Sequence, residues 1–341
     1  MHVDLWVAVA GAIVGFVVGL TGMGGGALMT PILVLLFRVD PLAAVSSDLV
    51  ASFVMKPVGG GVHLRRGTVN RSLVGWLVAG SVPCAFLGVL VLKALGDGQT
   101  VEDRLEVLLG AALLMASASM VAKAVLSTRR LRAGQAVHGG GTHAITVRPV
   151  ATLAVGALGG LIVGMTSVGS GSLIIVMLLA LYPSLRASEL VGTDLVQAVP
   201  LVGSAALGHL LFGDFELALT TSLLVGALPG VYVGARVSSK APDGVIRPAL
   251  IVVLVMSGLK LLGVATGALG VVLALMVLLG LPLWGVIDAV SRPRSAFAAA
   301  GEDRRTWIRR QALLAPVGAG AVAAVVYLVG ARRRVAAAVT P

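Results

Sequence analysis

Two glycine-rich clusters carry the residue types best suited to chemistry in this sequence. They are Thr21-Gly22-Met23-Gly24-Gly25-Gly26 and Thr166-Ser167-Val168-Gly169-Ser170-Gly171, and each interrupts an apolar segment. Glycine permits a positive φ and a close approach of the backbone to a ligand. A helix that restarts after such a break presents free N–H groups and the positive end of its dipole, which together bind a small anion. We therefore predict a substrate site formed by Thr21, Gly22, Gly24, Gly25, Gly26, Thr166, Ser167, Gly169, Ser170 and Gly171.

Close packing of helices is the structural alternative for these glycines. Gly11, Gly15 and Gly19 recur every four residues, which is the small-xxx-small spacing of tightly packed membrane helices. Packing explains these upstream glycines, but the clusters at 22–26 and 169–171 do not follow the spacing of one helix face. A Walker phosphate loop is excluded, because no Gly-Lys-Ser/Thr follows either cluster.

Two aspartates and one lysine lie inside otherwise apolar segments. Asp48 and Asp194 each follow a small hydroxyl residue, and Lys56 lies deeper, directly before Pro57. Because an ionisable group at membrane depth is costly, all three are candidates for coupling or gating, and Lys56 would attract an anion or pair with Asp48. Two structural alternatives stay open: the aspartates also suit helix N-caps, and the lysine is long enough to snorkel to the membrane surface.

Two histidines are further candidates for coupling. His63 and His209 each lie at the end of an apolar segment, before a turn glycine. Histidine titrates near neutral pH, so proton coupling is one interpretation. If the halves of the chain are inverted, the two histidines lie on opposite membrane faces, and capping of the preceding helix at the interface is favoured.

The motifs of common enzymes and metal sites are missing from the sequence. It contains neither an H-E-x-x-H zinc motif nor a Gly-x-Ser-x-Gly nucleophile elbow, and Cys84 is its one cysteine. We therefore expect no enzyme activity, no catalytic residue, no metal and no cofactor.

Composition places the chain in a membrane. Hydrophobic residues make up 57% of the 341 residues and charged residues only 12%, whereas a soluble domain carries about a quarter charged residues. The net charge of +11 lies in short clusters that flank apolar segments, which is typical of cytoplasmic anchors and not of a nucleic-acid binder. The start has no basic n-region, and the acidic Asp4 precedes the first apolar run, so we expect no cleavable signal peptide. The sequence predicts a multi-pass protein of a bacterial inner membrane, with lipids and a small anion as its partners and a homodimer as one assembly it allows.

Hydropathy predicts an all-α polytopic protein. The segments long and apolar enough to span a membrane are 43–62, 72–95, 104–125, 190–212, 216–237, 247–264, 268–290 and 311–330. Segments 5–37 and 149–182 are too long for one crossing and short for two. We predict that each is a broken helix or a re-entrant hairpin, with its exposed backbone satisfied by protein or water.

The chain contains an internal repeat. At an offset of 145, Gly15, Gly19, Thr21, Gly24 and Gly26 correspond to Gly160, Gly164, Thr166, Gly169 and Gly171. At an offset of 146, the matching pairs are Asp48 and Asp194, His63 and His209, Gly67 and Gly213, Gly80 and Gly226, Pro83 and Pro229, and Gly88 and Gly234. Coincidences of such special residues predict a duplication.

Charge bias then selects a topology. If both glycine-broken segments are re-entrant, the basic stretches at 63–71, 127–148, 238–247 and 291–310 all face the cytoplasm. The two repeats are then inverted, as in many secondary transporters. The tail Arg332-Arg333-Arg334 disagrees, because this topology places it outside. The predicted organisation is repeat 1 at 1–125, a basic cytoplasmic linker at 126–148, repeat 2 at 149–264, and two additional C-terminal helices within 265–341 with a basic loop at 291–310.

The chain resembles the TauE/SafE sulfite-exporter family, also called TSUP. GFVVGLTGMGGGALMTPIL near the start and GLIVGMTSVGSGSLIIVML after the linker carry the resemblance, together with the repeated Asp, His, Gly and Gly-x-x-Pro pattern that follows. It covers residues 5–264. Members of this family are membrane carriers associated with sulfite, sulfonates and other small sulfur or carboxylate anions. The resemblance implies that Gly22, Gly24, Gly25, Gly26, Gly169 and Gly171 line the permeation site.

Two features depart from the family pattern. The chain has additional segments after residue 268, and Ser167 and Ser170 stand where the first repeat has glycines, which breaks the symmetry of the site. We expect a secondary transporter of a small anion, with sulfite or an organosulfonate as candidates, that works by alternating access. A passive anion channel and a non-transporting membrane scaffold are the alternatives.

Overall fold

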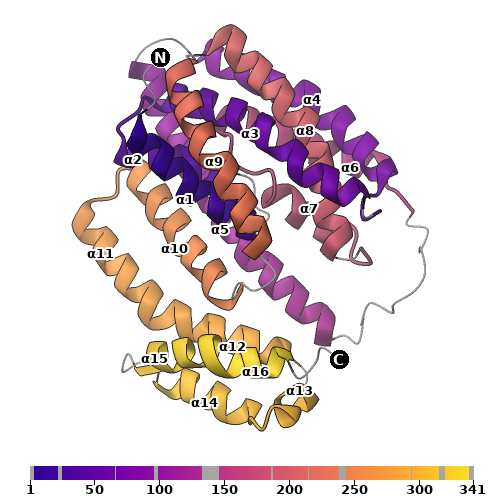
Figure 1. The fold of residues 1–341 in the computed structure, drawn as a ribbon, viewed down its shortest axis with the longest axis vertical. Helices are drawn as coiled ribbons and strands as arrows, with labels where there is room; N and C mark the ends of the chain where they lie inside the picture. Colours follow the sequence, from indigo (N-terminus) through magenta and orange to yellow (C-terminus); the bar gives the residue numbers. More distant parts are fainter. Residues whose placement is uncertain are drawn as a thin grey trace. The chain divides into compact units, whose positions relative to one another are not determined.

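A computed structural model shows helices joined by turns throughout the residues that it describes, which are 4–21, 25–65, 67–95, 99–132, 146–185, 187–213, 215–237, 243–292, 294–314 and 319–337 (Figure 1). Six helices in these ranges are long and apolar enough to cross a membrane: Arg71–Ala94, Val101–Leu126, Pro149–Thr166, Glu189–Phe212, Leu217–Gly234 and Thr266–Val290. Shorter apolar helices cover Leu5–Val18, Gly26–Leu36, Leu250–Leu261 and Gly320–Ala331. The prediction of an all-helical polytopic membrane protein is confirmed.

The chain divides into two compact units. The first comprises residues 1–119 and 141–239, and the second comprises 120–140 and 240–341. The helices of the first unit are α1 (Leu5–Thr21), α2 (Gly26–Leu36), α3 (Pro41–Arg65), α4 (Arg71–Ala94), the first part of α5 (Gln99–Arg132), α6 (Pro149–Thr166), α7 (Leu173–Leu181), α8 (Ala187–Phe212) and α9 (Leu217–Val237). Those of the second are the end of α5, α10 (Asp243–Leu261), α11 (Thr266–Leu275), η2 (Met276–Gly280), α12 (Leu281–Ser291), α13 (Arg294–Ala299), α14 (Arg304–Leu314), α15 (Ala319–Val326), η4 (Tyr327–Ala331) and α16 (Arg332–Ala337).

Glycines bring α1 against α9 in the first unit (Figure 1). A Cβ added to Gly15 would overlap the backbone of Ala227, and one added to Gly226 would overlap that of Ala8. A hydrogen in place of a side chain is what lets the two backbones approach this closely. The packing role predicted for Gly15 is therefore confirmed.

The same kind of contact joins α4 to α6. A Cβ on Gly80 would overlap the Leu153 carbonyl group, and one on Gly160 would overlap the backbone of Ser81. Since both helices are apolar, this close backbone packing is what holds them together where no water drives association.

Helices α3 and α8 lie side by side and run antiparallel. Ser46, near the start of α3, contacts His209 near the end of α8. At the opposite ends, a Cβ on Gly192 would lie 3.0 Å from the His63 ring. The start of α3 therefore contacts the end of α8, and the end of α3 contacts the start of α8.

Both predicted helix interruptions are confirmed. In segment 5–37, α1 ends at Thr21 and α2 begins at Gly26, and in segment 149–182, α6 ends at Thr166 and α7 begins at Leu173. One other expectation is wrong. Segment 311–330 is not one span, because the arginine-rich α14 ends at Leu314 and a separate helix begins at Ala319. The linker at 126–148 begins helical, since α5 extends to Arg132, and residues 133–145 lie outside the described residues.

We predict that Gly80→Ala weakens the packing of α4 against α6. The added methyl group collides with a backbone that cannot move freely, and overpacking of this kind costs about 1–3 kcal/mol of unfolding free energy. Gly75→Ala is the matched control on the same helix, because a Cβ there meets nothing within 4 Å, and it should stabilise by up to about 1 kcal/mol through helix propensity. Thermal unfolding in detergent measures both, and equal stability of the two variants would contradict the packing role.

Candidate functional site

The break between α6 and α7 depends on left-handed backbone conformations. Gly169 has a φ of 125° and Gly171 a φ of 93°, so the prediction that these positions need glycine is confirmed. Ser167 adopts a φ of 58°, and its N–H closes α6 by donating to the Val163 carbonyl group at 2.8 Å. This left-handed turn ends the helix and directs the chain to the start of α7.

More N–H groups at the start of α7 are hydrogen-bonded than the sequence predicts. The N–H groups of Ser172, Leu173 and Ile174 all donate to the Gly169 carbonyl group, at 3.3, 3.0 and 3.4 Å. The expectation that these first-turn groups are free is therefore wrong, because the tight glycine turn folds a carbonyl group back onto them. Within the described residues, the N–H groups of Ser170 and Gly171 make no hydrogen bond.

The break before α2 is closed by Gly25. Its carbonyl group accepts hydrogen bonds from the N–H groups of Leu28 and Met29 at 3.0 and 2.9 Å. The N–H groups of Gly26 and Ala27 form no hydrogen bond with any described residue, although both residues are buried. Of the other predicted site residues in this break, Gly22, Gly24 and the side chain of Thr21 lie outside the described residues.

The two breaks lie against each other. A Cβ on Gly26 would overlap the Ser167 carbonyl group, so this contact requires glycine. A Cβ on Gly25 would lie 3.7 Å from Asp48 and 3.6 Å from the Ser52 hydroxyl group. Both glycine clusters and helix α3 therefore meet at one place.

Asp48 lies at this meeting point and is fully buried. Its Oδ2 accepts hydrogen bonds from Thr30 of α2 at 3.0 Å and from Ser167 of the second break at 2.7 Å, and its Oδ1 accepts one from Ser52 at 3.5 Å. Because α3 begins at Pro41, well before this residue, the N-cap interpretation of Asp48 is wrong. The carboxylate instead joins the two breaks.

Lys56 lies two turns further along α3, and its side chain is also buried. Its ammonium group donates to the Ser170 hydroxyl group at 2.5 Å, which rules out snorkelling to the membrane surface. Asp48 and Asp194 both lie near enough to stabilise its positive charge electrostatically. The cation is thus directed at the second break and balanced by two carboxylates.

Asp194 occupies the same place in α8 that Asp48 occupies in α3, well inside a helix that begins at Ala187, so it is not an N-cap either. Its Oδ1 accepts a hydrogen bond from Gln197 Nε2 at 3.0 Å, and the side-chain oxygen Oε1 of Gln197 accepts one from the Ser81 hydroxyl group of α4 at 3.3 Å. This second carboxylate therefore connects α8 to α4.

The two histidines differ in their surroundings. His209 is fully buried, with Nδ1 2.9 Å from the Ser46 hydroxyl group and Nε2 2.9 Å from the Gly164 carbonyl oxygen at the end of α6. The prediction that His209 caps its own helix is therefore wrong, because its ring contacts the last turn of α6 instead. His63 lies in the turn that ends α3, with Nδ1 2.8 Å from the Thr68 hydroxyl group.

The sequence did not single out Thr30, Ser52, Ser81 or Gln197. Ser52 follows Asp48 by four residues and Gln197 follows Asp194 by three, which is the spacing of neighbours on one helix face, so these two were detectable. Among the described residues, no group of three or more His, Cys, Asp or Glu side chains could hold a metal ion. The site offers hydroxyl, amide, N–H and ammonium donors around two buried carboxylates.

Comparison with known proteins identifies the family. The family profile described as "Sulfite exporter TauE/SafE" matches residues 7–261. This chain belongs to the TauE/SafE family. The resemblance seen in the glycine motifs is confirmed, and the match ends before α11.

Curated relatives agree with this assignment. "Probable membrane transporter protein YjnA" of Bacillus subtilis (strain 168) is 34% identical over 253 residues, which cover 74% of this chain and 97% of that protein. "Probable membrane transporter protein YdhB" of the same organism is 24% identical over 252 residues, or 73% of this chain and 96% of that protein. No solved structure is significantly similar to the chain. The TauE/SafE protein is thus a multi-pass member of a family of membrane transporters, not of enzymes.

We predict that Ser167→Ala destabilises the protein. It removes the shortest hydrogen bond to the buried Asp48 carboxylate, and a lost hydrogen bond to a charged group costs about 1.5–3 kcal/mol. Thr221→Ala is the control, since that hydroxyl group bonds only to carbonyl groups of its own helix. A lower unfolding temperature for Ser167→Ala alone is expected in detergent, and unfolding temperatures equal to that of the unmodified protein would contradict the role of Ser167.

Proposed function

We propose that this TauE/SafE protein is a secondary transporter of a small anion, with sulfite or an organosulfonate as the candidate substrates. The observation that carries the proposal is the meeting of the two glycine breaks beside the buried Lys56 and Asp48. A packing role alone gives no reason for a lysine and two carboxylates at this place, because their burial is costly in a membrane.

The donors at the breaks suit an oxyanion. The N–H groups of Gly26 and Ala27 in the first break, and of Ser170 and Gly171 in the second, have no partner among the described residues. Lys56 adds a full positive charge, and it already binds the Ser170 hydroxyl group. Backbone N–H groups and a cation acting together bind small anions without covalent chemistry.

Asp48 is the coupling group in this proposal. An ionised carboxylate beside an incoming anion repels it, and a protonated carboxyl group would instead donate a hydrogen bond. Lys56 on α3 is the charged group near Asp48, and Lys56 in turn interacts with Asp194 on α8. Thr30 and Ser167 supply hydroxyl donors to Asp48. Proton uptake at Asp48 with anion binding follows from this arrangement.

Equivalent helix contacts support the proposal of inverted repeats. The offsets of 145 and 146 relate Ala8 to Leu153 and Gly226 to Gly80. Gly226 contacts Ala8 where α9 packs on α1, and the corresponding contact of Gly80 with Leu153 occurs where α4 packs on α6. The Gly15–Ala227 contact likewise becomes the Gly160–Ser81 contact.

The central helices obey the same relation. The contact of Ser46 with His209 becomes that of Gly192 with His63, and both occur. The helices that carry these contacts, α3 and α8, are equivalent in the predicted repeat and run antiparallel. A twofold axis perpendicular to both helices relates such a pair, as in transporters built from inverted repeats.

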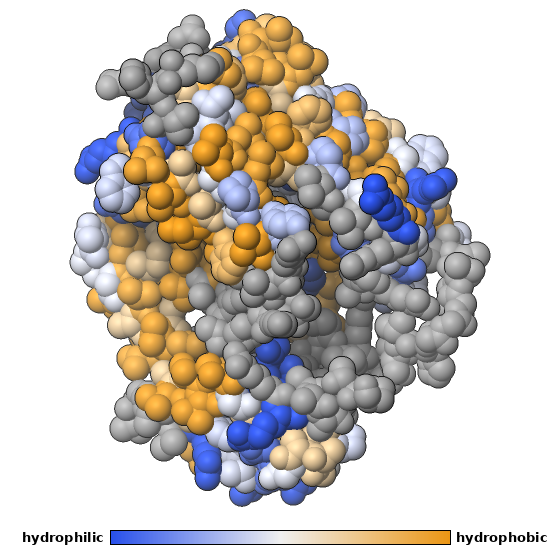
Figure 2. Space-filling view, in the orientation of Figure 1, coloured by the Kyte–Doolittle hydropathy of each residue, from blue (hydrophilic) through white to orange (hydrophobic). Residues whose placement is uncertain are grey.

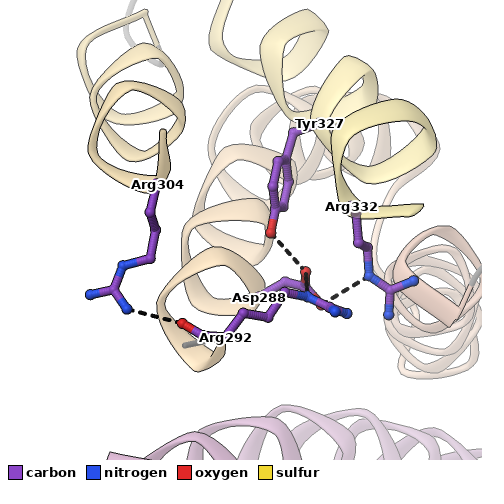
Figure 3. Close-up of polar contacts among 5 residues, drawn as sticks. All are labelled: Asp288, Arg292, Arg304, Tyr327 and Arg332. Carbon is purple, nitrogen blue, oxygen red and sulfur yellow. Dashed lines mark hydrogen bonds and ion pairs between the residues drawn. The ribbon is translucent and has the colours of Figure 1, made fainter. Parts of the chain in front are cut away.

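The C-terminal arginines also fit the proposed topology. In the second unit, Asp288 at the end of α12 binds Arg292 and Arg332, at 3.0 and 3.1 Å (Figure 3). The start of α16 therefore lies at the same end of this unit as the basic loop at 291–310. Because 311–330 is not a single crossing, the arginine tail no longer has to lie opposite that loop, and all these arginines suit the cytoplasmic side.

A passive channel and a membrane scaffold are the remaining alternatives. A channel would share the glycine breaks, but its flux would not saturate with anion concentration. A scaffold would carry no flux, and anions would not stabilise it beyond a general salt effect, because saturable stabilisation requires a bound ligand.

We predict that Gly25→Leu abolishes sulfite flux in proteoliposomes. A Cβ at this position has only ordinary contacts, but a longer side chain would extend among Asp48, Ser52 and Met55. At least a tenfold loss is expected in variant protein that still folds, which thermal unfolding in detergent verifies. Gly61→Leu on α3 is the control, since a Cβ there meets nothing within 4 Å. Full flux through a folded Gly25→Leu protein would rule out the site.

A further inference from the structure

The second unit carries a dense group of arginines that the proposed transport site does not use. Residues 288–341 contain nine arginines against three acidic residues, Asp288, Glu302 and Asp303. We propose that the outer face of α14, which carries Arg305 and Arg309, binds the phosphate headgroups of anionic membrane lipids. This inference does not depend on the transport function.

The membrane span that leads into this region fixes its depth. Residues Thr266–Val290 form a continuous apolar helix with only 11% of its most apolar window buried inside the protein. Leu283 on α12 and Val322 on α15 are 61% and 66% exposed, which suits contact with lipid hydrocarbon. Arg292 follows directly after this span, which places the arginines at the level of the lipid headgroups. In Figure 2, hydrophobic surface over α11 gives way to hydrophilic surface toward α14.

Asp288 holds the ends of two helices together at this level. Its Oδ2 accepts hydrogen bonds from Arg292 Nε at 3.0 Å and from Tyr327 Oη at 3.1 Å, and its Oδ1 accepts one from Arg332 Nε at 3.1 Å (Figure 3). Arg304 donates to the Arg292 carbonyl oxygen at 3.0 Å. These arginines are engaged within the protein and are not the proposed lipid ligands.

Glu302 engages another arginine and anchors α14. It accepts hydrogen bonds from Trp307 Nε1 at 2.8 Å and from Arg334 Nε at 3.0 Å. These two partners, Trp307 first, lower the pKa of the Glu302 carboxyl group. Glu302 therefore stays ionised at neutral pH, and its negative charge remains committed to Arg334.

Arg305 and Arg309 lie on the outer face of α14, while Arg310 of the same helix lies over the Trp307 ring. Trp307 and Gln311 point inward and are buried, while Arg305, Arg309 and Leu313 are exposed. These three recur every four residues, so they form one stripe along the helix. Neither Arg305 nor Arg309 lies within ion-pair distance of a described carboxylate, although Arg305 lies near enough to Asp303 to interact with it electrostatically.

This stripe matches the membrane interface. It runs from arginine to an apolar side chain over about 12 Å, at 1.5 Å per residue. Helix α14 packs against both α12 and α15. It runs antiparallel to them, because its start lies beside Arg292 and Tyr327 while Gln311 lies beside Gly285 and Ala324. Its arginine end therefore lies with the basic ends of its neighbours, and Leu313 lies toward the hydrocarbon. Arginine binds phosphate in a bidentate manner, and basic groups beside a span attract anionic lipids.

The test compares lipids added to the full-length protein in a neutral detergent. We expect phosphatidylglycerol to raise the unfolding temperature by several degrees and phosphatidylcholine to leave it unchanged. In the double variant Arg305→Gln, Arg309→Gln, the shift should fall to less than half. Arg305→Lys with Arg309→Lys keeps the charge and should retain most of the shift.

Two controls keep the outcome decisive. Without lipid, the Gln variant should unfold at the temperature of the unmodified protein, since both side chains are exposed. Inorganic phosphate at the same concentration should give a smaller shift than the lipid. A full phosphatidylglycerol shift in the Gln variant, or equal shifts from phosphatidylcholine or from free phosphate, would overturn the proposal.

Discussion

A carboxylate buried in a membrane protein needs hydrogen-bond donors, and at Asp48 these donors come from both halves of the chain. Thr30 lies beyond the first glycine break and Ser167 lies within the second, and both donate to the same oxygen. Because an unsatisfied buried charge is costly, this shared acceptor favours the arrangement in which the two breaks meet. The position of Lys56 against Ser170 then follows, since it lies two turns along the same helix.

Close glycine packing makes this meeting point reachable. The pairs α1–α9 and α4–α6 approach so closely that a methyl group at Gly226 or Gly80 would strike the opposite backbone. Each pair joins a helix from one half of the sequence to a helix from the other. The halves are thus interleaved, and in the proposed mechanism movement of one helix pair against the other would change access to the breaks.

The sequence predicted the glycine breaks and the buried charges because both are rare and costly features in an apolar segment. It could not predict Thr30 or Ser81, since small hydroxyl residues are common and only tertiary packing brings them to Asp48 and Gln197. For the same reason, the sequence could not predict that the His209 ring contacts the Gly164 carbonyl group, which belongs to another helix. Hydropathy also predicted a single membrane span at 311–330, because an average over this window does not detect that α14 ends within it.

Anion-dependent stabilisation of the purified protein tests the central claim most directly. The claim predicts that sulfite raises the unfolding temperature in a saturable way, and that Lys56→Met removes this shift while the protein stays folded. Chloride at equal ionic strength serves as the control for general salt effects. A sulfite shift that is unchanged in Lys56→Met, or no shift from sulfite, sulfonates or small carboxylates, would contradict an anion site at the meeting of the two breaks.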